Sequence, residues 1–384
     1  MNSFTFQSVP RIEVGAGTSV HLVAHLDRLG ALKRVVLITD KGIVGAGLLD
    51  TPLAALKEAG KTVLVIDDIV ADPPSVMVER TAAKARAFTP DCVIGFGGGS
   101  TMDTAKVVAL LCASDQKLES LYGIDQARGP RLPLILVPTT AGTGSEVTPI
   151  SVLTSQNGEK LGIISPHLYA DMALLDPVLT LGLPRHITAA TGVDAMVHAI
   201  EALTSARLKN PLSDTLALAA LKRLHGAIER ACNDGEDLAA RNDMMLGAMQ
   251  AGQAFDNAPV GAIHALAYPL GGQFHVTHGL SNALVMTPVM RFNLSEAAPI
   301  YAQIYDRLGL TGALCNAAKA EALIEELERI CVAIGLERRL RQVGVTHDDI
   351  GALADEGITV ERLLINNPVK MNRDNIYQIY EAVL

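Results

Sequence analysis

Apolar residues in the first half of the chain follow two alternating patterns. Four short segments are almost continuously apolar and predict strands, at residues 35–39, 62–67, 92–96 and 134–139. Such strands are typical of the centre of a parallel sheet that helices cover on both faces. Three longer segments space their apolar residues three and four positions apart and predict helices, at residues 43–60, 76–88 and 100–114. We therefore expect a doubly wound, mostly parallel α/β sheet.

Beyond Leu183 and Pro184 the strand pattern disappears and long helical periods follow. Four segments predict helices there, at residues 187–205, 212–231, 240–255 and 317–335. We expect an α/β domain over residues 1–185 and an all-helical domain over residues 186–384.

Composition and charge narrow the function classes. With 384 residues, 49% of them hydrophobic and 19% charged, the chain is long and apolar enough to fold into two domains. The net charge is −9 and like charges form no block, which excludes a basic nucleic-acid-binding surface. No apolar run reaches the length of about 18 residues that a membrane span needs, and the N-terminus does not resemble an export signal.

The five cysteines are odd in number, widely spaced and never paired as C-x-x-C. This spacing argues against a disulfide framework and against a thiolate zinc site. We therefore expect a cytoplasmic protein.

A glycine cluster follows the third predicted strand directly and precedes a predicted helix. Its members are Gly97, Gly98, Gly99 and Ser100. Glycines let the backbone approach an anion closely, and the N-terminus of a helix attracts phosphate. Asp103, expected in the first turn of the helix, also suits that dipole. The cluster lacks the third glycine of the usual dinucleotide fingerprint, so a simple tight turn has similar weight.

Two further features favour a nucleotide. Asp40 ends the first predicted strand, where a carboxylate would bind ribose hydroxyls and repel a 2'-phosphate, which favours NAD over NADP. The alternative role for Asp40 is a helix N-cap. After the fourth predicted strand, the polar loop 139–146 offers hydroxyls and amides to a diphosphate or to the nicotinamide ribose. A turn-rich connection is the alternative for this loop, but two such loops at the ends of neighbouring strands strengthen the nucleotide hypothesis.

Histidines and one aspartate suggest a metal site in the helical half. Asp194 and His198 are four residues apart in a helical pattern, so both side chains lie on one face, although an ordinary contact between them has more weight in isolation. His264, His275 and His278 follow within fifteen residues of an otherwise apolar region. Neutral imidazoles with one carboxylate suit a divalent cation. Spacing does not decide which histidines bind; we leave out His275, beyond an expected glycine turn at 271–272.

Four ordered motifs resemble the iron-containing, or group III, alcohol dehydrogenases. They are GGGSTMDTAK (97–106), PTTAGTGSEVT (138–148), TGVDAMVHAIEA (191–202) and HALAYPLGGQFHVTHGLSNAL (264–284). The resemblance implies a dehydroquinate synthase-like architecture, with a Rossmann-like NAD(P)-binding domain and a helical metal-binding domain. It also implies reversible interconversion of an alcohol and an aldehyde or ketone.

The resemblance assigns roles to residues at matching positions. The implied metal ligands are Asp194, His198, His264 and His278. The implied cofactor-binding residues are Asp40, Gly97, Gly98, Gly99, Ser100, Asp103, Thr139, Thr140, Thr143, Ser145 and Lys160. Many members carry a histidine implicated in proton relay where this chain has Tyr268, so the expected catalytic residues are Tyr268, through its hydroxyl, or His278. A relay through water and a packing role for Tyr268 are the alternatives. Asp72 likewise replaces an asparagine of the family.

The expected function is hydride transfer between a small alcohol or aldehyde and NAD, with NADP as the second choice of cofactor. The substrate oxygen is expected on a divalent metal, Fe²⁺ first and Zn²⁺ second, and the enzyme is expected to be a homodimer. The alternatives are a zinc polyol dehydrogenase, a dehydroquinate-synthase-type lyase and, with least weight, a non-enzymatic nucleotide-binding protein.

Overall fold

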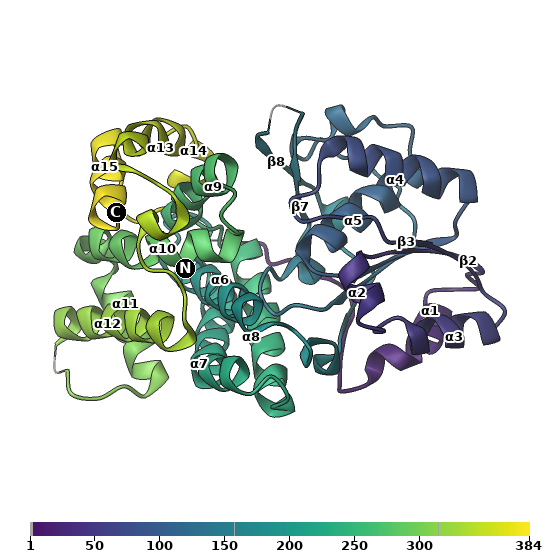
Figure 1. Cartoon of the computed structure of the whole chain (residues 1–384), viewed down its shortest axis with the longest axis horizontal. Coiled ribbons are helices and arrows are strands. Elements are labelled where there is room, and N and C mark those ends of the chain that lie inside the picture. The colour runs from purple at the N-terminus through teal and green to yellow at the C-terminus, as the bar shows by residue number, and fades with distance from the viewer. Residues whose placement is uncertain (1–2, 157, 314) are drawn as a thin grey trace. The chain divides into compact units, whose positions relative to one another are not determined.

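The computed structural model describes residues 3–156, 158–313 and 315–384. The chain forms two compact units (Figure 1). The α/β unit comprises Ser8–Thr140 and Gly144–Gly182. The helical unit comprises Leu183–Leu384, the short segment Ala141–Thr143 and the N-terminal residues through Gln7.

A six-stranded sheet in which all neighbouring strands are parallel forms the centre of the α/β unit. Its strands in spatial order are β1 (Ile12–Val14), β9 (Met172–Leu175), β6 (Leu134–Pro138), β4 (Cys92–Gly97), β2 (Arg34–Ile38) and β3 (Thr62–Ile66). The four predicted strands are confirmed to within a residue or so at their ends. The sequence analysis missed β1 and β9, which are only three and four residues long.

Helices cover both faces of this sheet, as the nearly continuous apolar strands predict. On one face, Leu22 of α1 (Leu22–Asp27) and Leu56 of α3 (Asp50–Glu58) join a core with alternate strand residues such as Leu37 and Ile94. On the other face, α4 (Ser75–Phe88) packs against β2 and β3, and α5 (Gly99–Ala113) packs against β2, β4 and β6. The doubly wound arrangement is therefore confirmed.

Two local features of this unit differ from the prediction. The helix expected over 43–60 is two helices, α2 (Lys41–Gly45) and α3, because Gly47 takes a left-handed φ of 70° between them. A second, three-stranded sheet of β5 (Gly123–Ile124), β8 (Lys160–Ile164) and β7 (Ile150–Thr154) was not expected. Its strands β7 and β8 form an antiparallel hairpin.

In the helical unit, the part of the chain that the structure describes contains no strand, which confirms the all-helical prediction. Its main helices are α6 (Arg185–Thr204), α7 (Pro211–Asn233), α8 (Leu238–Asn257), α9 (Ala262–Phe274), α10 (His278–Phe292), α11 (Leu294–Leu308), α12 (Asn316–Ile334), α13 (Ile350–Gly357), α14 (Glu361–Leu364) and α15 (Arg373–Ala382). Helix α6 is buried along most of its length and contacts α7, α8 and α10 (Figure 1). Over the described residues, each helix is too short or too polar to span a bilayer.

Candidate metal centre and cofactor loops

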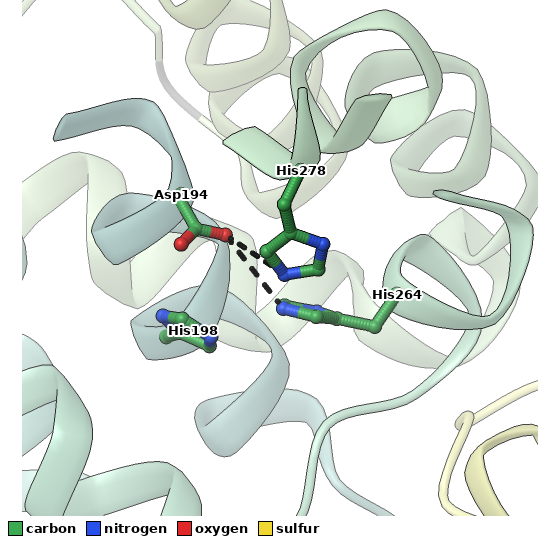
Figure 2. A group of neighbouring side chains, drawn as sticks. All are labelled: Asp194, His198, His264 and His278. Atoms are coloured by element: carbon green, nitrogen blue, oxygen red, sulfur yellow. Dashed lines mark ion pairs between the residues drawn. The ribbon is translucent and has the colours of Figure 1, made fainter. Parts of the chain in front are cut away.

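Four side chains from three helices converge inside the helical unit (Figure 2). Asp194 and His198 lie on α6, His264 lies on α9 and His278 is the first residue of α10. Each offers one ligand atom, and these atoms all lie within 4.8 Å of one another. Asp194 Oδ1 is 3.8 Å from His264 Nε2 and 3.6 Å from His278 Nε2. The structure thus brings together the four predicted ligands, which lie up to 84 residues apart in the sequence.

The four side chains differ in their exposure to solvent. Asp194, His198 and His264 are buried, whereas the side chain of His278 is 40% exposed. Burial lowers the pKa of His198 to about 3, so this imidazole is neutral at pH 7 and keeps a nitrogen lone pair free of a proton. Burial alone would raise the pKa of the Asp194 carboxyl, but its polar neighbours, among them the Asn282 amide that donates a hydrogen bond to it, outweigh burial and lower the pKa. The set is therefore ready to bind a cation.

Close packing of two helices brings His278 toward Asp194. Gly279, which follows His278, lies against the backbone of α6 so closely that a Cβ there would be 2.2 Å from the carbonyl oxygen of Ala190. Only a glycine permits that approach. The first turn of α10 is thereby held against the helix that carries two of the other ligands.

Two buried residues around the ligands were not singled out from the sequence. Asn282 Nδ2 donates to Asp194 Oδ1 at 2.7 Å and lies 3.3 Å from Nε2 of both His264 and His278. Glu201, on α6, accepts a hydrogen bond from the backbone N–H of Ile263 at 2.7 Å and lies 2.6 Å from His264 Nδ1. A glutamate between the apolar pairs Ala199–Ile200 and Ala202–Leu203 of α6 is the signal that could have found Glu201.

The chemistry of these donors fits a divalent metal. Three imidazole nitrogens and one carboxylate oxygen form a set of the type that iron and zinc bind, with a net charge of −1. Three of the ligand atoms already face one hydrogen-bond donor, the amide nitrogen of Asn282, so their lone pairs point toward a common region. A cation placed in that region would bind the same lone pairs that face the Asn282 amide, and it would carry a full positive charge.

His275 lies outside the four-residue group. The expected glycine turn is wrong, because α9 continues through Gly271 and Gly272 and ends at Phe274. The chain turns instead at His275, which has a left-handed φ of 56° and an exposed side chain. Leaving His275 out of the ligand set agrees with this geometry.

Tyr268, on α9, lies beside the ligand set. Its ring centroid is 6.2 Å from that of His278. The Tyr268 hydroxyl accepts a hydrogen bond of 3.3 Å from Arg362 Nη2, and the Arg362 guanidinium lies 5.7 Å from the centre of the tyrosine ring. The polar side chain of Tyr268 therefore lies next to His278, the exposed residue of the group.

In the α/β unit, the glycine cluster spans the end of β4 and the start of α5, as predicted. Gly98 is the N-cap of α5, and Ser100 Oγ accepts a hydrogen bond from the backbone N–H of Asp72. The expectation for Asp103 is wrong in one respect, because it lies beyond the first turn of α5. Its carboxylate accepts hydrogen bonds from Ser145 Oγ at 2.6 Å and from the backbone N–H of Val152 at 2.8 Å.

A fully buried lysine links the second predicted cofactor loop to α5, the helix that follows the glycine cluster. Lys106 Nζ donates to Ser145 Oγ at 2.8 Å and to the carbonyl oxygen of Ile150 at 2.6 Å, and it lies 3.6 Å from Asp103. Ser145 therefore bridges Lys106 and Asp103, both on α5. These contacts fix the loop after β6 against the helix that follows the glycine cluster, and the sequence analysis gave Lys106 no role.

The other predicted cofactor residues occupy varied positions. Asp40 is the N-cap of α2 and accepts a hydrogen bond from the backbone N–H of Ile43 at 3.1 Å. Thr139 is buried and donates its backbone N–H to Gly97, whereas Thr140 is partly exposed. Lys160 pairs with Asp72 at 2.5 Å.

Thr143 lies in the same loop as Thr140 and Ser145, in the short segment Ala141–Thr143 that belongs to the helical unit, and its role stays a prediction.

The chain matches two family models over most of its length. Residues 10–177 match the model described as iron-containing alcohol dehydrogenase, and residues 188–384 match the C-terminal model of the Fe-containing alcohol dehydrogenase family. Long-chain-alcohol dehydrogenase 1 of Geobacillus thermodenitrificans is 40% identical over 97% of this chain and 95% of its own length.

Solved structures agree with these matches. A crystal structure of 1,3-propanediol oxidoreductase superposes with a TM-score of 0.96 at 31% identity and covers all of both chains. The sulfoacetaldehyde reductase of Bifidobacterium kashiwanohense, solved in complex with NAD⁺, gives a TM-score of 0.91 at 27% identity, covering 100% of this chain and 99% of that one. These matches support a dehydrogenase rather than a lyase of the same architecture.

Proposed function

Because the chain belongs to the iron-containing alcohol dehydrogenase family, we propose that it interconverts an alcohol and an aldehyde or ketone by hydride transfer with NAD. The observation that carries this proposal is the convergence of Asp194, His198, His264 and His278 in one group, of which all but His278 are buried. We propose these four residues as the metal ligands.

In this proposal the metal, the cofactor and the ligand residues have separate roles. A divalent metal held by the four ligands supplies Lewis acidity toward the alcohol oxygen, and NAD supplies the hydride acceptor. Asp194 supplies the negative charge of the ligand set. Because His278 is the exposed ligand, the substrate is expected to approach from its side.

Tyr268 and His278 are the proposed catalytic side chains on that approach. Oxidation of an alcohol releases its hydroxyl proton, which needs an acceptor close to the reacting carbon. With its oxygen accepting a hydrogen bond from Arg362, the Tyr268 hydroxyl directs its own proton elsewhere and is available to pass a proton on. Tyr268 thus takes the relay position where many family members carry a histidine.

For the cofactor, we propose that the amides of Gly97–Ser100 at the start of α5 bind the diphosphate. Thr139, Thr140, Thr143, Ser145 and Lys160 are proposed as further cofactor contacts. For Ser145 and Asp103, their mutual hydrogen bond supports an additional role in holding the two loops together.

Asp40→Gly is expected to raise activity with NADP relative to NAD by about tenfold, equivalent to about 1.4 kcal/mol. The variant removes a carboxylate that would repel the 2'-phosphate, and glycine at an N-cap costs only a few tenths of a kcal/mol. The measurement is kcat/KM with each cofactor. Asp50→Asn removes an equal charge from the first turn of α3 and should leave the ratio unchanged. An unaltered ratio in Asp40→Gly would remove Asp40 from the cofactor site.

The direct test of the function is anaerobic purification, metal analysis and an NADH absorbance assay against a panel of alcohols, after loading with Fe²⁺ or Zn²⁺. Metal-dependent formation of NADH is the expected result. Bound metal and NAD without turnover on any alcohol or diol would contradict the dehydrogenase proposal.

Three finer points are also proposals. Fe²⁺ is the first choice of metal and Zn²⁺ the second, since the two compete for nitrogen and oxygen ligands. A cytoplasmic location is supported by the five cysteines, all of which are free thiols. A homodimer is proposed from the family resemblance, and sedimentation of the purified enzyme would test it.

A further inference from the structure

Glu201 is a buried acid that the proposed chemistry does not use. It lies seven residues after Asp194 and three after His198, so all three side chains project from one face of α6. Its side chain is only 5% exposed. Burying a carboxylate costs free energy unless hydrogen bonds compensate it, so its partners indicate its role.

Both oxygens of the Glu201 carboxyl have partners at the start of α9. Oε1 accepts the backbone N–H of Ile263 at 2.7 Å, and Oε2 lies 2.6 Å from His264 Nδ1. An N–H of the backbone only donates, so Oε1 is fixed as an acceptor. The Glu201 carboxyl thereby contacts both the backbone of α9, at Ile263, and the side chain of the proposed ligand His264.

The surroundings of the other ring nitrogen of His264 also indicate that the ring proton lies on Nδ1. Nε2 lies 3.3 Å from Asn282 Nδ2. The amide nitrogen of Asn282 is the atom that faces this region, because it also donates to the Asp194 carboxylate. When the ring carries a single proton, that proton on Nδ1 faces an acceptor, Glu201 Oε2, whereas on Nε2 it would face the NH₂ group of Asn282, so it belongs on Nδ1.

We propose that Glu201 is a positioning residue that fixes the Nδ1–H tautomer and the ring orientation of His264, so that the Nε2 lone pair faces the metal site. This inference rests on the proposed metal site. Carboxylates that accept a hydrogen bond from a metal-binding histidine commonly raise metal affinity ten- to a hundredfold. Glu201 is expected to act through His264 without touching substrate.

Glu201→Gln tests the proposal with almost no change of shape. The glutamine oxygen still accepts from Ile263, but its NH₂ group now donates to His264 Nδ1 and drives the ring proton to Nε2, where it opposes a metal. We expect the affinity for Zn²⁺, measured by competition with a chromophoric chelator, to fall ten- to a hundredfold. In metal-free protein, nitrogen NMR of labelled histidine should show the His264 proton on Nδ1 in the wild type and on Nε2 in the variant.

A matched control exists in the same unit. His225 Nε2 lies 2.9 Å from Glu326 Oε1, so Glu326→Gln changes a histidine–carboxylate pair outside the ligand set, although it also removes the ion pair of Glu326 with Arg329. Its Zn²⁺ affinity should equal that of the wild type. Equal thermal unfolding of the metal-free wild type and Glu201→Gln would confirm that the loss of affinity is not a loss of fold.

The outcomes separate this inference from the proposed function. If the wild type binds Zn²⁺ and Glu201→Gln binds it equally well, the positioning role is overturned. If the wild type binds no Zn²⁺, the metal site itself fails, and the tautomer measurement still judges Glu201. A wild-type His264 that carries its proton on Nε2 overturns the proposal even if the variant does not fold.

Discussion

Replacing His264 with alanine is expected to remove bound metal and turnover together. His264 supplies a buried imidazole nitrogen from α9, and the remaining ligands come from α6 and α10, so its loss leaves the set open on one side. A loss of kcat of about a thousandfold or more is expected, equivalent to about 4 kcal/mol of transition-state stabilisation. Metal content by elemental analysis and the rate of NADH formation should be measured on the same sample.

His275→Asn provides the matched control for this prediction. It removes a histidine three residues from His278, and asparagine tolerates the left-handed conformation that His275 adopts. Metal content and turnover should both be retained. A His264→Ala enzyme that loses its metal but keeps its activity would show that the metal takes no part in the reaction.

Gly279→Ala is expected to lower the free energy of unfolding by about 3 kcal/mol, at the upper end of the cost of overpacking. The new methyl carbon would lie 2.2 Å from the Ala190 carbonyl oxygen and 2.6 Å from its carbonyl carbon, so the backbones of α6 and α10 would have to separate. Because Gly279 follows His278, metal affinity should fall as well. Urea denaturation of the metal-free protein measures the first effect, and Zn²⁺ titration measures the second.

Gly226→Ala is the control for the general effect of replacing a helical glycine. Gly226 lies within α7, and a Cβ there would have no neighbour within 4 Å. Alanine is favoured over glycine in a helix by up to about 1 kcal/mol, so this variant should be as stable as the wild type or more stable. If Gly279→Ala is equally well tolerated, the close contact between α6 and α10 does not hold the ligands in place.

The central strands were predictable because burial on both faces demands continuous apolar runs, such as residues 92–96. The outer strands β1 and β9 were not, because three or four residues carry too little pattern. The helix predicted over 43–60 broke at Gly47 because a positive φ is a property of the folded turn, which apolar spacing does not report. Local periodicity thus predicted the layers and missed the interruptions.

At the candidate site, the types of ligand were predictable, but their partners were not. Histidines gathered in an apolar region predicted a metal site, whereas the full set of four residues that the structure groups was implied by the resemblance to the iron-containing alcohol dehydrogenases. The roles of Glu201 and Lys106 depend on contacts with residues 62 and 39 positions away in sequence. Spacing along one helix cannot reveal such contacts. The same limit explains Asp103, which suited a helix dipole in the sequence but hydrogen-bonds Ser145 and Val152 in the structure.

The amide of Asn282 has a consequence for how the enzyme recovers from loss of its metal. By donating to Asp194 and facing both His264 and His278, it keeps three ligand atoms gathered through hydrogen bonding within the protein alone. Ligands that are preorganised in this way give up little conformational freedom when an ion arrives. If the proposed metal site is right, protein depleted of its metal by a chelator is therefore expected to take up a divalent cation again without refolding.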